Sequence, residues 1–202
     1  MEEKITYYEE SGLDNTTNTL RLAAERARER GINTIVLAST RGDTAREAAE
    51  LFEGTNVKLV VVPHQYGFGE GQRFPQELVD ELESKGHYVH FGTMLFHTDG
   101  FYGDKIPSVM AGILRTFCQG MKVVHEIVMM AADGGRILTG DIVIAVTGTG
   151  RGADTAAVVT AATSTKFHEL KVREIICKPL ETKSWPAGER PPFAKAPQPA
   201  ER

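Results

Sequence analysis

Residues 34–44 read TIVLASTRGDT, a short apolar run that leads into a turn rich in hydroxyl groups and glycine. The core of the run, Ile35-Val36-Leu37, does not alternate between polar and apolar residues, and neither does a second run, Leu59-Val60-Val61-Val62. Strands that are apolar on both faces are typical of a parallel sheet covered by helices on both sides. The stretch therefore predicts a fully buried strand in an α/β domain.

Around this stretch, strand-like and helical patterns alternate along the chain. Because parallel neighbours need long crossover connections, the alternation predicts a largely parallel sheet with helices on both faces. The expected strands are residues 34–38, 58–62, 88–92, 142–146 and 174–178. The expected helices are residues 15–30, ended by Gly31, then 43–52, 75–85, a long zone 107–133 interrupted at Gln119-Gly120, and 153–165.

The composition is that of one globular domain. The chain has 202 residues, of which 41% are hydrophobic and 25% charged, which predicts one sizeable core. A formal net charge of −4 offers no basic face to a polyanion, so we expect no nucleic acid partner, and we expect no membrane partner. We assign residues 1–180 to a single domain and the proline-rich residues 181–202 to a weakly ordered tail.

The cysteines and the start of the sequence bear on the compartment. Cys118 and Cys177 have no CxxC spacing and no metal-ligand spacing, which indicates buried thiols in a reducing environment. The opening residues, Met1-Glu2-Glu3-Lys4, do not resemble a signal peptide. We therefore expect a cytoplasmic location.

Two turns that follow predicted strands are the candidate binding sites. Glycine lets a backbone approach a ligand closely, and free N–H groups in the first turn of a helix attract anions. Arginine in each turn adds charge-assisted contacts to a phosphate. The competing interpretation is that glycine and hydroxyl residues only make good turns and helix caps. The phosphate-binding candidates are Ser39, Thr40, Arg41, Gly42 and Thr44 in the first turn, and Thr147, Gly148, Thr149, Gly150, Arg151 and Gly152 in the second.

Two further loops, residues 63–74 and 93–106, leave the same predicted edge of the sheet and carry aromatic residues. Loops of this length in a compact domain are commonly lids or binding segments. Their rings can stack on a planar ligand, or they can pack the loops down or form a subunit contact. The ring-stacking or lid candidates are His64, Tyr66, Phe68, Phe96, Phe101 and Tyr102.

No catalytic or metal-binding pattern accompanies these loops. His64, His90 and His97 lie near the same predicted edge, but their spacing matches no ligand motif such as HExxH, so we expect no metal. The sequence contains no G-x-S-x-G nucleophile motif and no GxxxxGK[ST] phosphate loop. We therefore assign no catalytic residue, and whether the protein is an enzyme stays open.

Over residues 15–180 the pattern resembles the C-terminal α/β domain of pyruvate kinase. The resemblance rests on the helix before the first strand, the Ser39-Thr40-Arg41-Gly42 turn, and Ile144-Ala145-Val146-Thr147-Gly148 before the second glycine turn. It implies a three-layer α/β/α sandwich. The implied sheet is mostly parallel and five-stranded, with order 3-2-1-4-5 and an antiparallel last strand.

In regulated pyruvate kinases the first turn holds a phosphate of a sugar bisphosphate effector. By resemblance, that role falls on Ser39, Thr40, Gly42 and Thr44. Arg41 and Asp43 depart from the small hydroxyl residues common in the family, so the identity of the effector does not transfer. This sequence shows no counterpart of the catalytic barrel, and the resemblance therefore does not imply pyruvate kinase activity.

Three functions compete at this point. The first is binding of a small phosphorylated ligand, either a phosphometabolite or a mononucleotide such as FMN, by the two glycine turns and the aromatic loops. The second is a flavin- or dinucleotide-dependent oxidoreductase, because Gly148-x-Gly150-x-x-Ala153 matches the dinucleotide fingerprint. The third is a homo-oligomeric assembly or regulatory module, since pyruvate kinase C-terminal domains contribute to subunit contacts.

Overall fold

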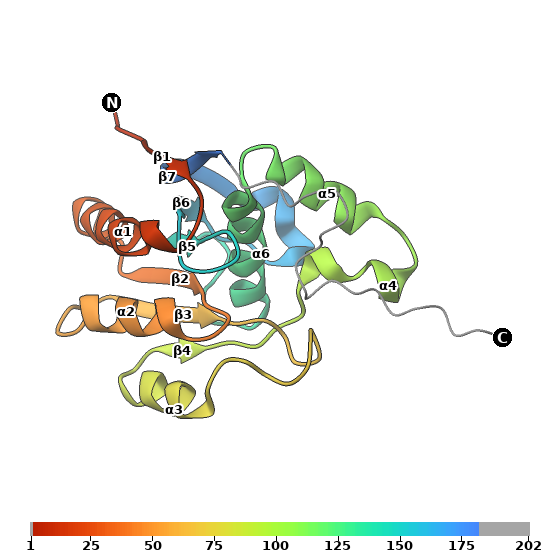
Figure 1. The fold of residues 1–202 in the computed structure, drawn as a ribbon, viewed down its shortest axis with the longest axis horizontal. Helices are drawn as coiled ribbons and strands as arrows, with labels where there is room; N and C mark the ends of the chain where they lie inside the picture. The colour runs from red at the N-terminus through yellow and green to blue at the C-terminus, as the bar shows by residue number, and fades with distance from the viewer. Residues whose placement is uncertain (1, 182–202) are drawn as a thin grey trace.

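The computed structural model describes residues 2–181, and the tail predicted from residue 182 onward lies outside them. Within the described residues the strands form one seven-stranded sheet in the order β1-β7-β6-β5-β2-β3-β4 (Figure 1). Neighbouring strands are parallel except at β6, which runs antiparallel to both β5 and β7. The strands are β1 Thr6–Glu10, β2 Thr34–Ala38, β3 Lys58–Val62, β4 Tyr88–Val89, β5 Ile142–Thr147, β6 Thr155–Thr160 and β7 Lys171–Glu181.

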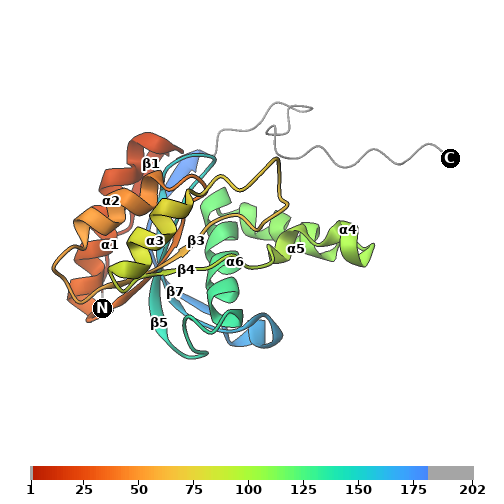
Figure 2. The same cartoon turned by 90° about the horizontal axis from the view of Figure 1, so that it is seen from below.

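Helices cover both faces of this sheet. The view in Figure 2 places α1, α2 and α3 on one side of the sheet and α6 on the other, with α4 and α5 beyond α6. The helices are α1 Thr16–Arg30, α2 Asp43–Leu51, α3 Gln76–Ser84, α4 Asp99–Tyr102, α5 Ile106–Arg115 and α6 Gln119–Asp133. Short 3₁₀ helices occupy Leu13–Asn15, Leu95–His97 and Ser164–Glu169.

The core is divided by the sheet into two apolar clusters. Ile35 and Leu37 on β2 belong to the cluster under α1, α2 and α3, whereas Val36 belongs to the cluster under α6. All three side chains are fully buried. This is the expected consequence of a strand whose side chains alternate between two covered faces.

The predicted α/β/α sandwich and mostly parallel sheet are confirmed. Of the predicted order 3-2-1-4-5, the first four strands appear as β4-β3-β2-β5, and β6 lies between β5 and the last strand, β7, which pairs antiparallel with β6. The sheet has seven strands in place of five because β1 and β6 were not predicted. β1 is a short edge strand with a mostly exposed pattern, which carries little hydrophobic signal.

The prediction of a helix over residues 153–165 is wrong. Residues Thr155–Thr160 form β6, followed by the 3₁₀ helix Ser164–Glu169. Five of the six residues of β6 are buried, since both faces of the sheet are covered here, and the sequence therefore lacks the alternation that marks a strand. The second glycine turn consequently joins two antiparallel strands and does not lead into a helix.

The long helical zone is divided as expected, but not at the predicted residues. α5 ends at Arg115 and α6 begins at Gln119, so the break spans residues 116–118. Gly120 lies inside α6, where a Cβ atom would overlap the side chain of Thr155 on β6. The glycine therefore permits close helix-to-sheet packing and does not mark the interruption.

Candidate functional site

The two glycine turns lie next to each other at one edge of the sheet. They follow β2 and β5, which are parallel neighbours with Leu37 opposite Val146. An ion pair connects the turns, because Nη2 of Arg151 lies 3.2 Å from Oδ2 of Asp43 in the first turn of α2. Both side chains are 61% exposed. The sheet order therefore brings together the two segments that the sequence singled out.

The first turn is held by its own hydroxyl group and by a close glycine contact. The Ala45 N–H donates to Ser39 Oγ over 3.3 Å, so this buried hydroxyl caps α2. Gly42 has a φ of 95°, and a Cβ atom there would overlap the Leu78 side chain. Thr44 is buried, whereas Arg41 is exposed. Arg41 is thus the one exposed member of the predicted set in this turn.

The second turn is anchored by a buried carboxylate that sequence reasoning did not single out. Asp154 Oδ2 accepts hydrogen bonds from the Gly12 N–H at 3.0 Å and the Thr149 N–H at 3.1 Å. Its Oδ1 atom accepts from Thr155 Oγ1 at 2.8 Å. Burial raises the pKa of Asp154, although these hydrogen bonds oppose the shift. The carboxylate ties the turn to the segment before α1.

The glycines of the second turn have different tasks. A Cβ atom at Gly148 would overlap the Gly152 carbonyl oxygen, and one at Gly152 would lie 2.7 Å from Leu13 Cα. Gly152 has a φ of 74° and Gly150 a φ of 77°, but Gly150 faces open space. Gly148 and Gly152 therefore serve packing, and Gly150 is the position where a ligand can approach the backbone.

Two further expectations for this turn need correction. Thr147 is fully buried and donates from Oγ1 to the Gly120 carbonyl oxygen at 2.9 Å, so its hydroxyl belongs to the core of the fold. The sequence that matches the dinucleotide fingerprint is followed by β6, so it lacks the helix whose N-terminus binds the pyrophosphate. The structure of this turn therefore does not support the alternative of a dinucleotide-binding site.

The loop of residues 63–74 is fixed to the first turn at both ends. At its start, the Ser39 N–H donates to the carbonyl oxygen of Val62, the last residue of β3. At its end, Pro75 and Leu78 lie against Gly42. The loop therefore rises and returns beside the first glycine turn.

Two groups of rings occupy this loop and the segment after β4. Tyr66, which is 61% exposed, has its ring centroid 5.0 Å from that of Phe91. Phe68 makes edge contacts with His64 at 4.7 Å and His97 at 5.1 Å. Burial, assisted by the charge of Arg73, lowers the pKa of His64 to about 4, so its ring is neutral at pH 7. Tyr66 is the mostly exposed ring of this loop, whereas Phe91, which was not among the predicted candidates, is partly buried against the core cluster under α1, α2 and α3.

Beside the His64, Phe68 and His97 rings lies a buried ion pair on α6. Lys122 Nζ pairs with Glu126, and both side chains are almost fully inaccessible. Lys122 also donates to His97 Nε2 at 3.1 Å, and Glu126 Oε1 accepts from the Phe96 N–H at 3.0 Å. Burial lowers the pKa of Lys122. The pair fastens the segment after β4 to α6, and its four-residue spacing in an apolar helix is the signal that could have revealed it.

Three of the predicted ring candidates do not belong to this edge. Phe96 is only 6% exposed and packs in a small core cluster with Ala111 and Met129, so it is not available to a ligand. Phe101 and Tyr102 lie on α4, on the far side of α6 from the turns (Figures 1 and 2). The long segment after β4 folds into helices that leave the sheet edge, which removes these rings from the site.

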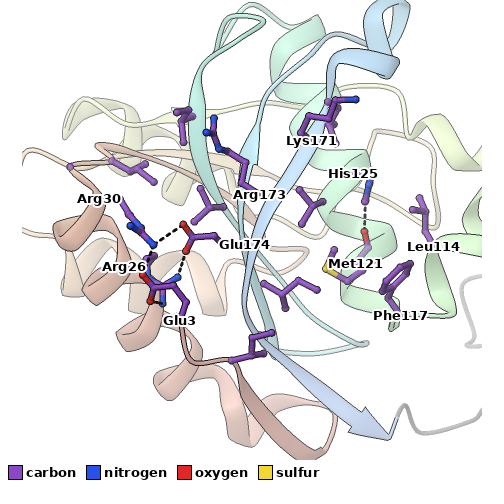
Figure 3. Close-up of a pocket in the computed structure, with 18 of the residues that line it drawn as sticks. Glu3, Arg26, Arg30, Leu114, Phe117, Met121, His125, Lys171, Arg173 and Glu174 are labelled. Atoms are coloured by element: carbon purple, nitrogen blue, oxygen red, sulfur yellow. Dashed lines mark hydrogen bonds and ion pairs between the residues drawn. The ribbon is translucent and has the colours of Figure 1, made fainter. Parts of the chain in front are cut away.

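A groove of about 1220 Å³ lies elsewhere, beside the half of β7 that β1 does not cover. Figure 3 shows Arg26 and Arg30 on one side of it, paired with Glu3 and Glu174. The opposite side is formed largely by Leu114, Phe117, Met121 and His125. The groove contains none of the predicted ligand-binding residues, and Glu3 and Glu174 pair with two of its three arginines, Arg26 and Arg30.

The fold and the paired turns can now be compared with known proteins. The family model described as "Pyruvate kinase, alpha/beta domain" matches residues 17–159, more than half of the chain. The chain belongs to the pyruvate kinase alpha/beta domain family. The matched region extends from the start of α1 to the end of β6 and contains both glycine turns.

Solved structures similar to this family member include pyruvate kinases of Cryptosporidium parvum. One such enzyme and its complex with ADP each show 16% identity and a TM-score of 0.41, and each match covers 72% of this chain. A third structure of that enzyme shows 15% identity and a TM-score of 0.39. This chain corresponds to only 22% or 23% of the length of those enzymes.

Three further observations concern the described part of the chain as a whole. Among residues 2–181, no helix has both the length and the hydrophobicity needed to cross a bilayer. In the same residues, no group of three or more histidine, cysteine, aspartate or glutamate side chains is arranged to hold a metal ion. Cys118 and Cys177 are buried free thiols, as predicted.

Proposed function

We propose that this family member binds a small molecule with a terminal phosphate group between the two glycine turns. The observation that carries the proposal is the contact between Arg151 and Asp43, which joins the turns at the carboxyl ends of β2 and β5. Ligands of open α/β sheets bind at this edge. The proposed function is binding, and we assign no kinase reaction to it.

The ion pair supplies an anion site that is easily opened. An exposed ion pair contributes about 0 to 1 kcal/mol, so an incoming phosphate can displace Asp43 from Arg151 at little cost. A phosphate monoester carries more charge than a carboxylate and offers more acceptor oxygens to a guanidinium. Asp43 is the first residue of α2, and the exposed Arg41 lies two residues before it in the same turn. Asp43 thus occupies the position that we assign to the phosphate.

The aromatic residues favour a ligand with a flat ring over a sugar phosphate. Tyr66, which is 61% exposed, presents ring surface on the loop that begins beside the first turn, and its ring packs against the partly buried Phe91. A sugar phosphate would leave this surface without a partner, whereas a mononucleotide such as FMN has both a phosphate and a planar ring system. FMN is therefore the ligand class with which the proposal is tested first.

The test uses the protein as purified. An absorbance spectrum and mass spectrometry of the material released on denaturation should detect a flavin or another phosphorylated metabolite. If the preparation is colourless, thermal shifts with FMN, AMP and glucose 6-phosphate at equal concentration should rank FMN first. Absence of a released ligand together with no thermal shift from any of the three would reject the proposal.

A matched pair of variants locates the site. Gly150→Asp places a negative charge at the open position of the second turn and should abolish retention of the ligand. Gly150→Asn adds a side chain of the same size that tolerates a positive φ and carries no charge. Retention lost in the aspartate variant and kept in the asparagine variant would support an anion site, and equal retention in both would contradict it.

A further inference from the structure

The helices α4 and α5 carry an apolar face that nothing in the described chain covers. One side of α5 packs against the rest of the domain, because Ala111 is buried and Leu114 is partly buried in the small cluster with Phe96 and Met129. The residues that remain outside are between 37% and 86% exposed. We call them the α5 face: Phe101, Tyr102, Ile106, Val109, Met110, Ile113 and Phe117.

The spacing and size of the α5 face indicate an interface. Ile106, Val109, Met110 and Ile113 follow the i, i+3, i+4, i+7 pattern of a helix side that packs against another element. From the exposed fractions, the seven side chains present on the order of 800 Å² of apolar surface, above the 300–600 Å² of the largest patch on a typical monomer. A standard interface needs about 800 Å² from each partner. One copy of this face therefore supplies half of a stable contact.

We propose that the α5 face packs against the same face of a second copy of this chain, with the two α5 helices antiparallel about a two-fold axis. In such an isologous contact each residue meets its symmetry counterpart. With the axis between Val109 and Met110, Ile106 of one copy lies at the height of Ile113 of the other. The same axis places Val109 of one copy beside Met110 of the other, so apolar residues of the two α5 helices meet along the contact.

A second copy fits this face better than a lipid surface does. A helix that lies on a membrane normally carries several lysine or arginine residues beside its apolar face. Between Ile106 and Ile113 the α5 face has no charged residue, and Lys105 and Arg115 are the only basic residues among residues 104–117.

Size-exclusion chromatography with light scattering on the full chain tests the proposal. The wild type should have twice the chain mass of 22.1 kDa, and Ile113→Asp should have the mass of a monomer. Leu138→Asp, which changes a 69% exposed residue outside the α5 face, should remain dimeric. Circular dichroism should show the same helix content in all three proteins, because both substituted residues are exposed. A monomeric wild type, or an Ile113→Asp protein that stays dimeric, would overturn the proposal.

Disulfide cross-linking tests the antiparallel register of the two α5 helices. A mixture of Ile106→Cys and Ile113→Cys chains should form a disulfide-linked heterodimer on mild oxidation, faster than either variant alone. Equal rates in the mixture and in the separate variants would overturn the register. Binding of a monomeric wild type to vesicles of phosphatidylcholine and phosphatidylglycerol would overturn the dimer in favour of a membrane surface.

Discussion

Asp43 Oδ2 and Arg151 Nη2 lie 3.2 Å apart, and this contact joins two turns that are 108 positions apart in the sequence. Each side chain is mostly exposed, so the pair contributes little to the stability of the fold. The pair matters for its location. The Asp43 carboxylate now contacts the Arg151 guanidinium, which we propose binds the phosphate of a ligand.

The first prediction is that substitutions of Asp43 and Arg151 change the affinity for FMN in opposite directions. Asp43→Asn removes a competing anion and should tighten FMN binding by about 2- to 5-fold, the equivalent of an exposed ion pair of up to about 1 kcal/mol. Arg151→Gln removes the cation and should weaken binding by about 10-fold or more, because a hydrogen bond to a charged group contributes about 1.5–3 kcal/mol. Titration by flavin fluorescence measures both. Changes of the same sign in the two variants would contradict the assignment.

The second prediction separates the two glycines with positive φ in the second turn. Gly150→Ala faces open space and should lower the free energy of unfolding by about 1–2 kcal/mol, the cost of the left-handed conformation for alanine. Gly152→Ala adds an overlap with Thr16 and Leu13 and should lower it by a further 1–3 kcal/mol or so. Urea unfolding provides both values. Equal losses in the two variants would show that the packing around Gly152 is looser than described.

The third prediction concerns the buried pair on α6. Lys122→Met should lower the free energy of unfolding by about 3–5 kcal/mol, because Glu126 would be left buried without its counter-charge. Adding Glu126→Gln removes that charge while keeping an acceptor for the Phe96 N–H, and should restore at least about 2 kcal/mol of the loss. Chemical denaturation of the two single variants and the double variant forms the test. Additive losses would contradict a coupled buried pair.

The fourth prediction is a loss of stability in mild acid. The folded pKa of His64 is about 4 and its ordinary value is 6.5, so between these values the unfolded chain binds a proton that the folded chain does not. This stability is present above pH 6.5 and is lost as the pH falls toward 4, by roughly 3 kcal/mol in total. Burial also lowers the pKa of His87, His90, His97 and His125, which acts in the same direction.

Urea unfolding at pH 7 and pH 5 measures this effect. His64→Gln should lose less stability between the two pH values than the wild type does. His168→Gln, which changes an exposed histidine in the 3₁₀ helix before β7, should lose as much as the wild type. An unchanged pH dependence in the His64 variant would contradict a neutral, buried ring.

Much of the fold follows from local sequence patterns. Ile35-Val36-Leu37 and Leu59-Val60-Val61-Val62 have no alternation because helices cover both faces of the sheet, and this alone indicates a parallel α/β arrangement. Gly31, with a φ of 64°, ends α1 as its position predicts. Such signals depend on only a few neighbouring residues, so they can be identified without the tertiary structure.

Other features depend on contacts that no local pattern reveals. The residues of β6 are small and uniformly buried, so only their hydrogen bonds to β5 distinguish a strand from a helix. Phe96, Phe101 and Tyr102 look equivalent in the sequence, but helix formation after β4 buries the first and carries the other two away from the turns. The Asp154 anchor depends on the Gly12 N–H, 142 positions away.

The most direct measurement of the central claim is a paired titration of the wild type and Arg151→Gln with FMN and with riboflavin, which lacks the phosphate. We predict that the wild type binds FMN at least about 10-fold more tightly than riboflavin, since the phosphate adds charge-assisted hydrogen bonds. This preference should largely disappear in Arg151→Gln. Equal affinities of the wild type for the two flavins, or a preference that survives the substitution, would contradict a phosphate site between the two glycine turns.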